Sequence, residues 1–99
     1  MGWVGAYELE HAEPGMPSYL TVLTSSGIAF NDIDQVADGS WTLEGNEGVL
    51  IEWTSGRRSL LEPTADGIPK PEERFAVQHW DPGVPIDQPA SANGSGIRL

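Results

Sequence analysis

The stretch from residue 38 to residue 57 constrains the fold of this chain more than any other part of the sequence. It holds two short runs of alternating residues, separated by the glycine-bounded segment 45–48 and followed by a second turn signal at Ser55-Gly56. The apolar residues that share one parity within each run are Trp41 and Leu43, then Val49, Ile51 and Trp53. Because successive side chains of a strand point to opposite faces, each run can turn one apolar face inward. The pattern predicts a β-hairpin.

The same alternation appears on both sides of this hairpin. Trp3, Tyr7 and Leu9 share the odd positions of the first run, and further strands are expected at 19–24, 28–30, 58–62 and 74–80. In the last of these, one parity carries Phe75, Val77 and His79. Twelve glycines and eight prolines argue for many turns and little helix. We therefore expect an all-β domain, a small antiparallel meander of about six to seven strands that curves into a barrel or a sandwich.

Residues 81–99 read as an extended or disordered C-terminal arm, rich in Pro and Gly, that follows a β domain of residues 1–80. This composition cannot build a core of its own. The apolar residues of the arm are Val84, Ile86, Ile97 and Leu99. They predict that the arm packs on this domain or on a neighbouring protein. Since the expected core residues precede Trp80, we expect the meander to fold without the arm but to lose its partner.

The charge of the chain is strongly negative, with a formal net value of −10. No Lys or Arg precedes Arg57, whereas nine acidic residues do: Glu8, Glu10, Glu13, Asp32, Asp34, Asp38, Glu44, Glu47 and Glu52. Binding to phosphates requires cations, so we expect no direct nucleic-acid binding and no attraction to anionic membranes. Two explanations stay open at this point, a surface for a basic partner and a charge that only keeps the protein soluble.

Targeting and membrane signals are missing from the sequence as it stands. No apolar run approaches the length of a membrane span, and the amino terminus lacks the basic and apolar regions of a secretory signal. We therefore expect no membrane insertion and take the cytoplasm as the default compartment.

The chemistry-bearing residues do not form a known catalytic or metal-binding motif. The chain has no Cys, and its imidazoles are His11 and His79. The acidic segment 32–38 invites a calcium interpretation, but Ala37 stands at the EF-hand's glycine position and Leu43 at its closing glutamate position. No Gly-x-Ser-x-Gly motif appears, and no His stands near a candidate nucleophile in the sequence. The sequence therefore predicts no metal, no cofactor and no enzyme activity.

Four tryptophans are more than a core of this size requires. Trp is enriched at contact surfaces because its indole N–H needs a partner when buried. Parity places Trp41 and Trp53 in the core, whereas Trp3 and Trp80 are better candidates for exposed contact residues. The predicted partner-binding residues are Trp3, Trp80, Val84, Ile86, Ile97 and Leu99.

The Gly-x-Trp motif at Gly39-Ser40-Trp41, among short sequential strands, resembles the lipocalin and avidin group of small meander β-barrels over residues 3–62. The segments from Trp53 to Arg58 and from Trp80 to Gly83 are also similar to small bacterial β domains of no assigned activity. The first resemblance implies a barrel, with a small-ligand site at its mouth.

The sequence favours a non-catalytic interaction or structural subunit that docks on a larger protein assembly through exposed Trp and the C-terminal arm. An alternative is a small-ligand-binding barrel whose mouth is lined by Trp3, Tyr7, Trp41 and Trp53. A further alternative is an acidic inhibitor of a basic protein site. The sequence leaves open whether the chain forms an oligomer.

Overall fold

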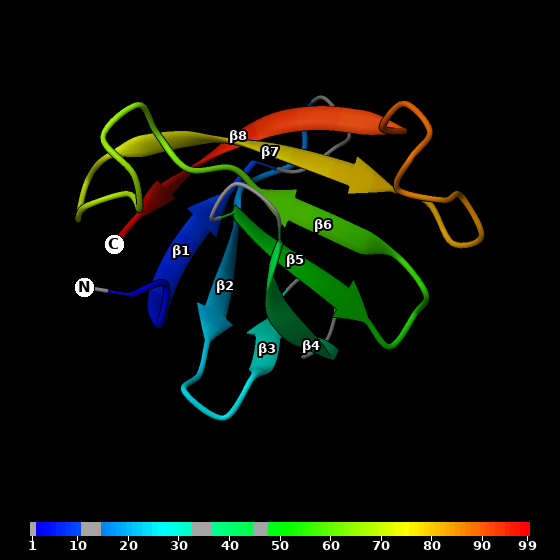
Figure 1. The fold of residues 1–99 in the computed structure, drawn as a ribbon, viewed down its shortest axis with the longest axis horizontal. Coiled ribbons are helices and arrows are strands. Elements are labelled where there is room, and N and C mark those ends of the chain that lie inside the picture. Colours follow the sequence, from blue (N-terminus) through cyan, green and yellow to red (C-terminus); the bar gives the residue numbers. More distant parts are fainter. Residues whose placement is uncertain (1, 11–14, 33–36, 45–47) are drawn as a thin grey trace.

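The structure is a computed structural model that describes residues 2–10, 15–32, 37–44 and 48–99. The described chain consists of eight strands joined by turns and connections (Figure 1). The strands are β1 (Gly5–Leu9), β2 (Tyr19–Leu23), β3 (Ile28–Asn31), β4 (Ala37–Glu44), β5 (Gly48–Trp53), β6 (Arg58–Leu61), β7 (Arg74–Trp80) and β8 (Ala92–Arg98). Each strand pairs antiparallel with the next, and β8 returns to pair with β1, so the sheet is a closed barrel. No helix suited to crossing a membrane occurs in the described segments.

The prediction of an all-β class is confirmed, and the barrel is the form that the meander takes. The expected hairpin is the β4–β5 pair, in which Trp41 stands opposite Ile51. The strands expected from alternation coincide with β1 to β7 within one or two residues, as is usual for strand ends in a sequence-based assignment. The expected number of six to seven strands is wrong, because residues 92–98 add an eighth.

Strand β8 corrects the expected domain limit after residue 80. It pairs with β7 from Ala92 to Ile97 and with β1 from Gly96 to Arg98. The C-terminal part of the predicted arm is therefore a barrel strand with neighbours on both sides, and residues 81–91 are the connection that leads into it. The alternation test missed this strand because its residues are mostly small and polar (Ala-Asn-Gly-Ser-Gly).

Gly96 is the position of β8 at which no side chain fits. A Cβ atom at this position would lie 2.5 Å from Leu9 Cδ2 and 2.8 Å from Phe75 Cζ, both of which belong to side chains of the neighbouring strands. These side chains are buried and fill the interior beside the glycine, so only hydrogen fits there. Gly96 is thus a packing requirement and not a mark of disorder.

Polar contacts also hold β8 in place. The Arg98 side chain is 6% exposed, and its guanidinium donates to the carbonyls of Pro69 (2.9 Å) and Val4 (2.8 Å). It also lies 5.5 Å from the centre of the Tyr7 ring, a cation–π distance. In the middle of the strand, the hydroxyl and the backbone N–H of Ser95 both donate to Glu10 Oε1 (2.8 and 2.9 Å), which lowers the pKa of that carboxyl.

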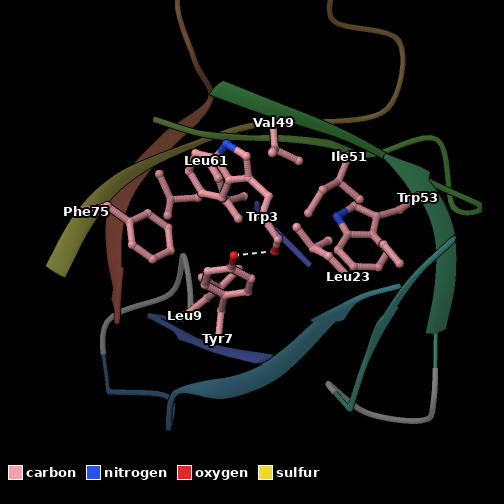
Figure 2. Close-up of a cluster of buried hydrophobic side chains, with 11 residues drawn as sticks. Trp3, Tyr7, Leu9, Leu23, Val49, Ile51, Trp53, Leu61 and Phe75 are labelled. Atoms are coloured by element: carbon pink, nitrogen blue, oxygen red, sulfur yellow. Dashed lines mark hydrogen bonds between the residues drawn. The ribbon is translucent and has the colours of Figure 1, made fainter. Parts of the chain in front are cut away.

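The core fills the interior of the barrel (Figure 2). It contains the residues that alternation assigned to it, Tyr7, Leu9, Val49, Ile51, Trp53, Phe75 and Val77, together with Leu23 and Ala29, which the sequence analysis did not single out. Three aromatic rings pack edge to face or tilted, with Phe75 lying 6.1 Å from Trp3 and 5.6 Å from Tyr7 between ring centres. The Tyr7 hydroxyl donates to the Trp3 carbonyl oxygen. Val77 and His79 are 1% and 3% exposed, so the inward parity predicted for their strand is confirmed.

Leu43 departs from its predicted inward position, because 66% of it is exposed. Its partner across the hairpin, Val49, is fully buried. Pairing between β3 and β4 begins at Ile28 and Ser40, so Leu43 lies beyond the end of β3 and has no β3 neighbour to cover it. The end of the barrel, and not the parity of the residue, decides its exposure.

We predict that deletion of residues 92–99 destroys the cooperative fold, contrary to the expectation from sequence. The deletion removes both pairings of β8 and leaves β1 and β7 as unpaired edges beside an opened core. Thermal unfolding followed by circular dichroism measures the effect, with removal of Leu99 alone as the control that keeps β8. A truncated chain with an unchanged unfolding midpoint would show that closure is dispensable.

We predict that Gly96→Ala lowers the free energy of unfolding by about 1–3 kcal/mol, because the new methyl group overpacks the space beside Leu9 and Phe75. Gly94→Ala in the same strand is the matched control, since its Cβ would lie 3.7 Å from Glu10 Cβ, an ordinary contact. Urea unfolding of both variants gives the comparison. Equal effects at the two positions would contradict the packing account.

Candidate protein-docking face

The outer surface of β8, β1, β2 and β3 carries a row of apolar side chains. Leu99 follows β8, and its backbone N–H donates to the Ala6 carbonyl (3.0 Å). Ala6 stands opposite Val22, and Val22 stands opposite Phe30. Directly opposite residues of antiparallel strands point to the same face, so this row continues across neighbouring strands. We call the group formed by this row and its neighbours Leu20 and Ile28 the docking face, which consists of Ala6, Leu20, Val22, Ile28, Phe30 and Leu99.

The large apolar side chains of the docking face are exposed to solvent. The exposed fractions are 39% for Leu20, 42% for Ile28, 38% for Phe30 and 56% for Leu99. Scattered single apolar residues are ordinary on protein surfaces, but a contiguous group marks an interaction site. Here the group is contiguous, because strand pairing places its members side by side.

A hollow of about 430 Å³ opens beside the docking face. Its lining includes Leu20 and Leu99 from the face itself, the carboxylates of Glu8 and Asp32, and Tyr19. Asp32 Oδ1 accepts a hydrogen bond from the Leu20 backbone N–H (2.7 Å), which fixes the orientation of this carboxyl group. The hollow thus combines apolar walls with negative charge.

The charges around the docking face are negative. Glu8 and Asp32 border it at the hollow, and exposed Asp38 stands opposite Phe30 on β4. Arg57 pairs with Asp81 (3.3 Å), Arg58 donates to the Val84 carbonyl and Arg98 lies inside the barrel, while Lys70 lies in the β6–β7 connection. Arg74 is separated from Glu8 by one strand, because it stands opposite Ile97, which stands opposite Glu8. The sequence-level asymmetry of charge is therefore also present at this face.

Trp3 and Trp80 do not have the exposure that the sequence analysis expected, since 2% and 3% of these residues are exposed. Trp3 packs edge to face on Phe75 in the core. Trp80 donates its indole N–H to the Gln88 carbonyl (2.9 Å), which anchors the β7–β8 connection over it. Exposure was wrongly predicted because position near a chain end or an arm says nothing about what covers a side chain.

The other predicted contact residues are divided between two places. Val84 and Ile86 lie in the β7–β8 connection, outside the docking face. Ile97 is half-buried on β8 opposite Glu8, and Leu99 lines the hollow. Of the six predicted residues, only Leu99 belongs to the docking face, and Ile97 lies on the neighbouring strand β8 opposite Glu8.

Sequence reasoning missed Leu20, Val22, Ile28 and Phe30, although a signal for them exists. The run Tyr19–Leu23 is apolar on both parities apart from Thr21. An antiparallel strand with one solvated face should alternate apolar and polar residues. Apolar residues on both parities therefore indicate a strand that is covered on its outer side as well.

A polar chain inside the barrel involves Trp53, Ser59 and His79. The Trp53 indole N–H donates to Ser59 Oγ (3.0 Å), which lies 2.9 Å from His79 Nδ1. The β6–β7 register places Ser59 opposite His79, a proximity that the sequence analysis did not foresee. Ser59 is 1% exposed and already receives the Trp53 N–H, so this contact satisfies buried polar groups and offers no accessible nucleophile.

No group of three or more potential metal ligands gathers among the residues that the structure describes. His11 and Asp34, which the sequence analysis weighed as ligands, lie outside those residues. The expected absence of a metal or cofactor stays a prediction.

Comparisons with family models, with curated proteins and with solved structures yield no match to this chain. The resemblance to lipocalin and avidin barrels therefore stays a prediction, and function is inferred from the residues of the chain itself.

We predict that both tyrosines resist ionisation in the folded protein. Burial raises the pKa of Tyr7 and of Tyr19 to about 12, from an ordinary 10.0, although Arg98 and Arg57 respectively oppose the shift. Between these values the folded state holds protons that the unfolded state releases, so stability is complete below pH 10 and falls as pH rises toward 12. Phenolate absorbance near 295 nm measures the titration, with the urea-unfolded chain as reference. Ionisation of either residue near pH 10 before unfolding would contradict its burial.

Proposed function

We propose that this protein is a non-catalytic interaction subunit that docks on a larger protein or assembly through its docking face. The observation that carries the proposal is the contiguous apolar group on the outside of four adjacent strands, whose large members are 38–56% exposed. Covering these side chains would contribute about 25 cal/mol for each Å² of apolar surface removed from water. The same burial would drive association with a partner.

Closure of the barrel limits how a partner can be recognised. Each described strand is paired on both sides, so the sheet offers no free edge to which a partner strand could add. Recognition therefore depends on outward side chains, and the docking face is where the apolar ones gather.

Charge favours a basic partner over a second copy of the chain. Two copies that met through this face would bring Glu8, Asp32 and Asp38 toward the same carboxylates of the other copy, and each copy carries a net charge of −10. Like charges that face each other disfavour association. A partner with an apolar centre and a cationic rim complements both features of the surface.

The packed interior of the barrel favours the docking function over the alternative of a ligand-binding barrel. The alternative of a ligand-binding barrel placed Trp3, Tyr7, Trp41 and Trp53 at the mouth. Trp3, Tyr7 and Trp53 are 0–7% exposed and belong to the packed core, and Trp41 is partly buried against that core and donates its indole N–H to the Thr24 carbonyl (2.8 Å). The acidic-inhibitor alternative shares the basic partner, but it gives no role to the exposed Leu, Ile and Phe side chains.

The proposal predicts position-specific crosslinking in the native host. A p-benzoylphenylalanine residue at position 30 should give a discrete adduct with a partner, and the same residue at Ala76, exposed on β7, should not. With the partner identified and purified, Phe30→Asp should raise the dissociation constant at least about tenfold, because a charge replaces an apolar contact.

Ala76→Asp is the matched control, since it adds the same charge to the outside of the barrel away from the docking face. Equal adduct yields at positions 30 and 76, or equal binding by the two Asp variants, would refute docking through this face.

A further inference from the structure

We propose that the hollow beside the docking face binds a lysine or arginine side chain of the partner, an inference that rests on the proposed docking function. The aliphatic stem of that side chain would lie against Leu20 and Leu99, and its charged group would lie between Glu8 and Asp32. The partner's contact segment then carries a cation next to apolar residues.

The lining of the hollow matches both parts of such a side chain. Lys and Arg have an aliphatic stem that packs on apolar surface and a charged head that stays near water or a counter-ion. Leu20 and Leu99 supply apolar surface, while Glu8 and Asp32 supply carboxylates in the same hollow. A volume of about 430 Å³ accommodates one long side chain with water around its head.

A backbone hydrogen bond orients the Asp32 carboxyl group for this role. Its Oδ1 atom accepts the Leu20 N–H at 2.7 Å, so the carboxyl group is oriented before any partner arrives. An ionised carboxylate has about four acceptor positions, and one backbone hydrogen bond leaves capacity for a guanidinium or ammonium donor. A charge-assisted hydrogen bond of this kind is stronger than a neutral one.

The chain supplies no cation of its own to these carboxylates in its described part. The ion pair found there joins Arg57 to Asp81, and the Arg98 guanidinium is occupied inside the barrel by Pro69 and Val4 carbonyls. Among the described residues neither Glu8 nor Asp32 forms an ion pair, so both carboxylates are open to a cation from another molecule.

The test uses the full chain and small side-chain mimics. n-Butylguanidinium and n-butylammonium are titrated into the ¹⁵N-labelled protein, with n-butanol as the uncharged control, and amide shifts are followed by NMR. We expect saturable shifts at Glu8, Leu20, Asp32 and Leu99 with either cation, and binding at least about tenfold weaker with n-butanol. The two cations separate an arginine from a lysine preference.

The double variant E8Q/D32N should weaken binding of the preferred cation about tenfold, because Gln and Asn keep the shape of the hollow and remove its charge. E52Q/D66N is the matched control, since both residues are exposed acids outside the hollow and the change in net charge is the same. Dispersed amide spectra of both variants establish that they are folded.

Equal affinity for n-butanol and the cations, shifts scattered over the barrel, or equal binding by E8Q/D32N and E52Q/D66N would overturn the cation site. Crosslinking at position 30 tests docking separately. F30D should lose the partner yet keep its affinity for the cation mimic, because Phe30 does not line the hollow. Failure of the cation site with crosslinking intact would thus leave the docking proposal standing.

Discussion

The pairing of β8 with β1 joins the two ends of the chain, and the rest of the structure depends on it. Without that pairing β1 and β8 would be exposed edges, and the aromatic core would open toward water. Arg98 strengthens the closure from inside. Burying a guanidinium is unfavourable unless its donors are satisfied, and the carbonyls of Val4 and Pro69, with the Tyr7 ring, offset that cost. The same residue thereby ties the N-terminal segment and the β6–β7 connection to the last strand.

Closure also determines where this protein can interact. A closed barrel of this size fills its interior with side chains and uses its backbone groups for strand pairing. Contact with another molecule is then a property of outward side chains. The docking face extends across the junction between the chain ends, because Leu99 lies beside Ala6. The proposed binding surface therefore exists only in the closed barrel, and fold stability and docking are linked through the same strand.

The candidate site could be predicted from the sequence only in part. The excess of acidic residues before Arg57 left a basic partner as one of two explanations, and Leu99 is the predicted contact residue that also belongs to the proposed docking face. Trp3 and Trp80 were assigned to the surface because Trp is common at interfaces, but such a preference is an average that burial in a particular core overrides. Phe30 was missed because alternation was used to find the inner face of each strand, and the outer face was taken as solvated.

The sequence by itself indicated the strands from β1 to β7 and many of the residues that point inward from them, although Leu43 was wrongly placed in the core and Trp3 wrongly on the surface. Alternation is a local property of two successive residues, so Tyr7, Leu9 and Val77 could be assigned to the core without knowledge of their neighbours. Only the tertiary structure decided that residues 92–98 form a strand. Position 96 requires glycine because the side chains of Leu9 and Phe75 leave no room for a Cβ atom, and both residues lie far away in the sequence. Alternation within a strand is local, whereas the space available between strands is set by the whole barrel.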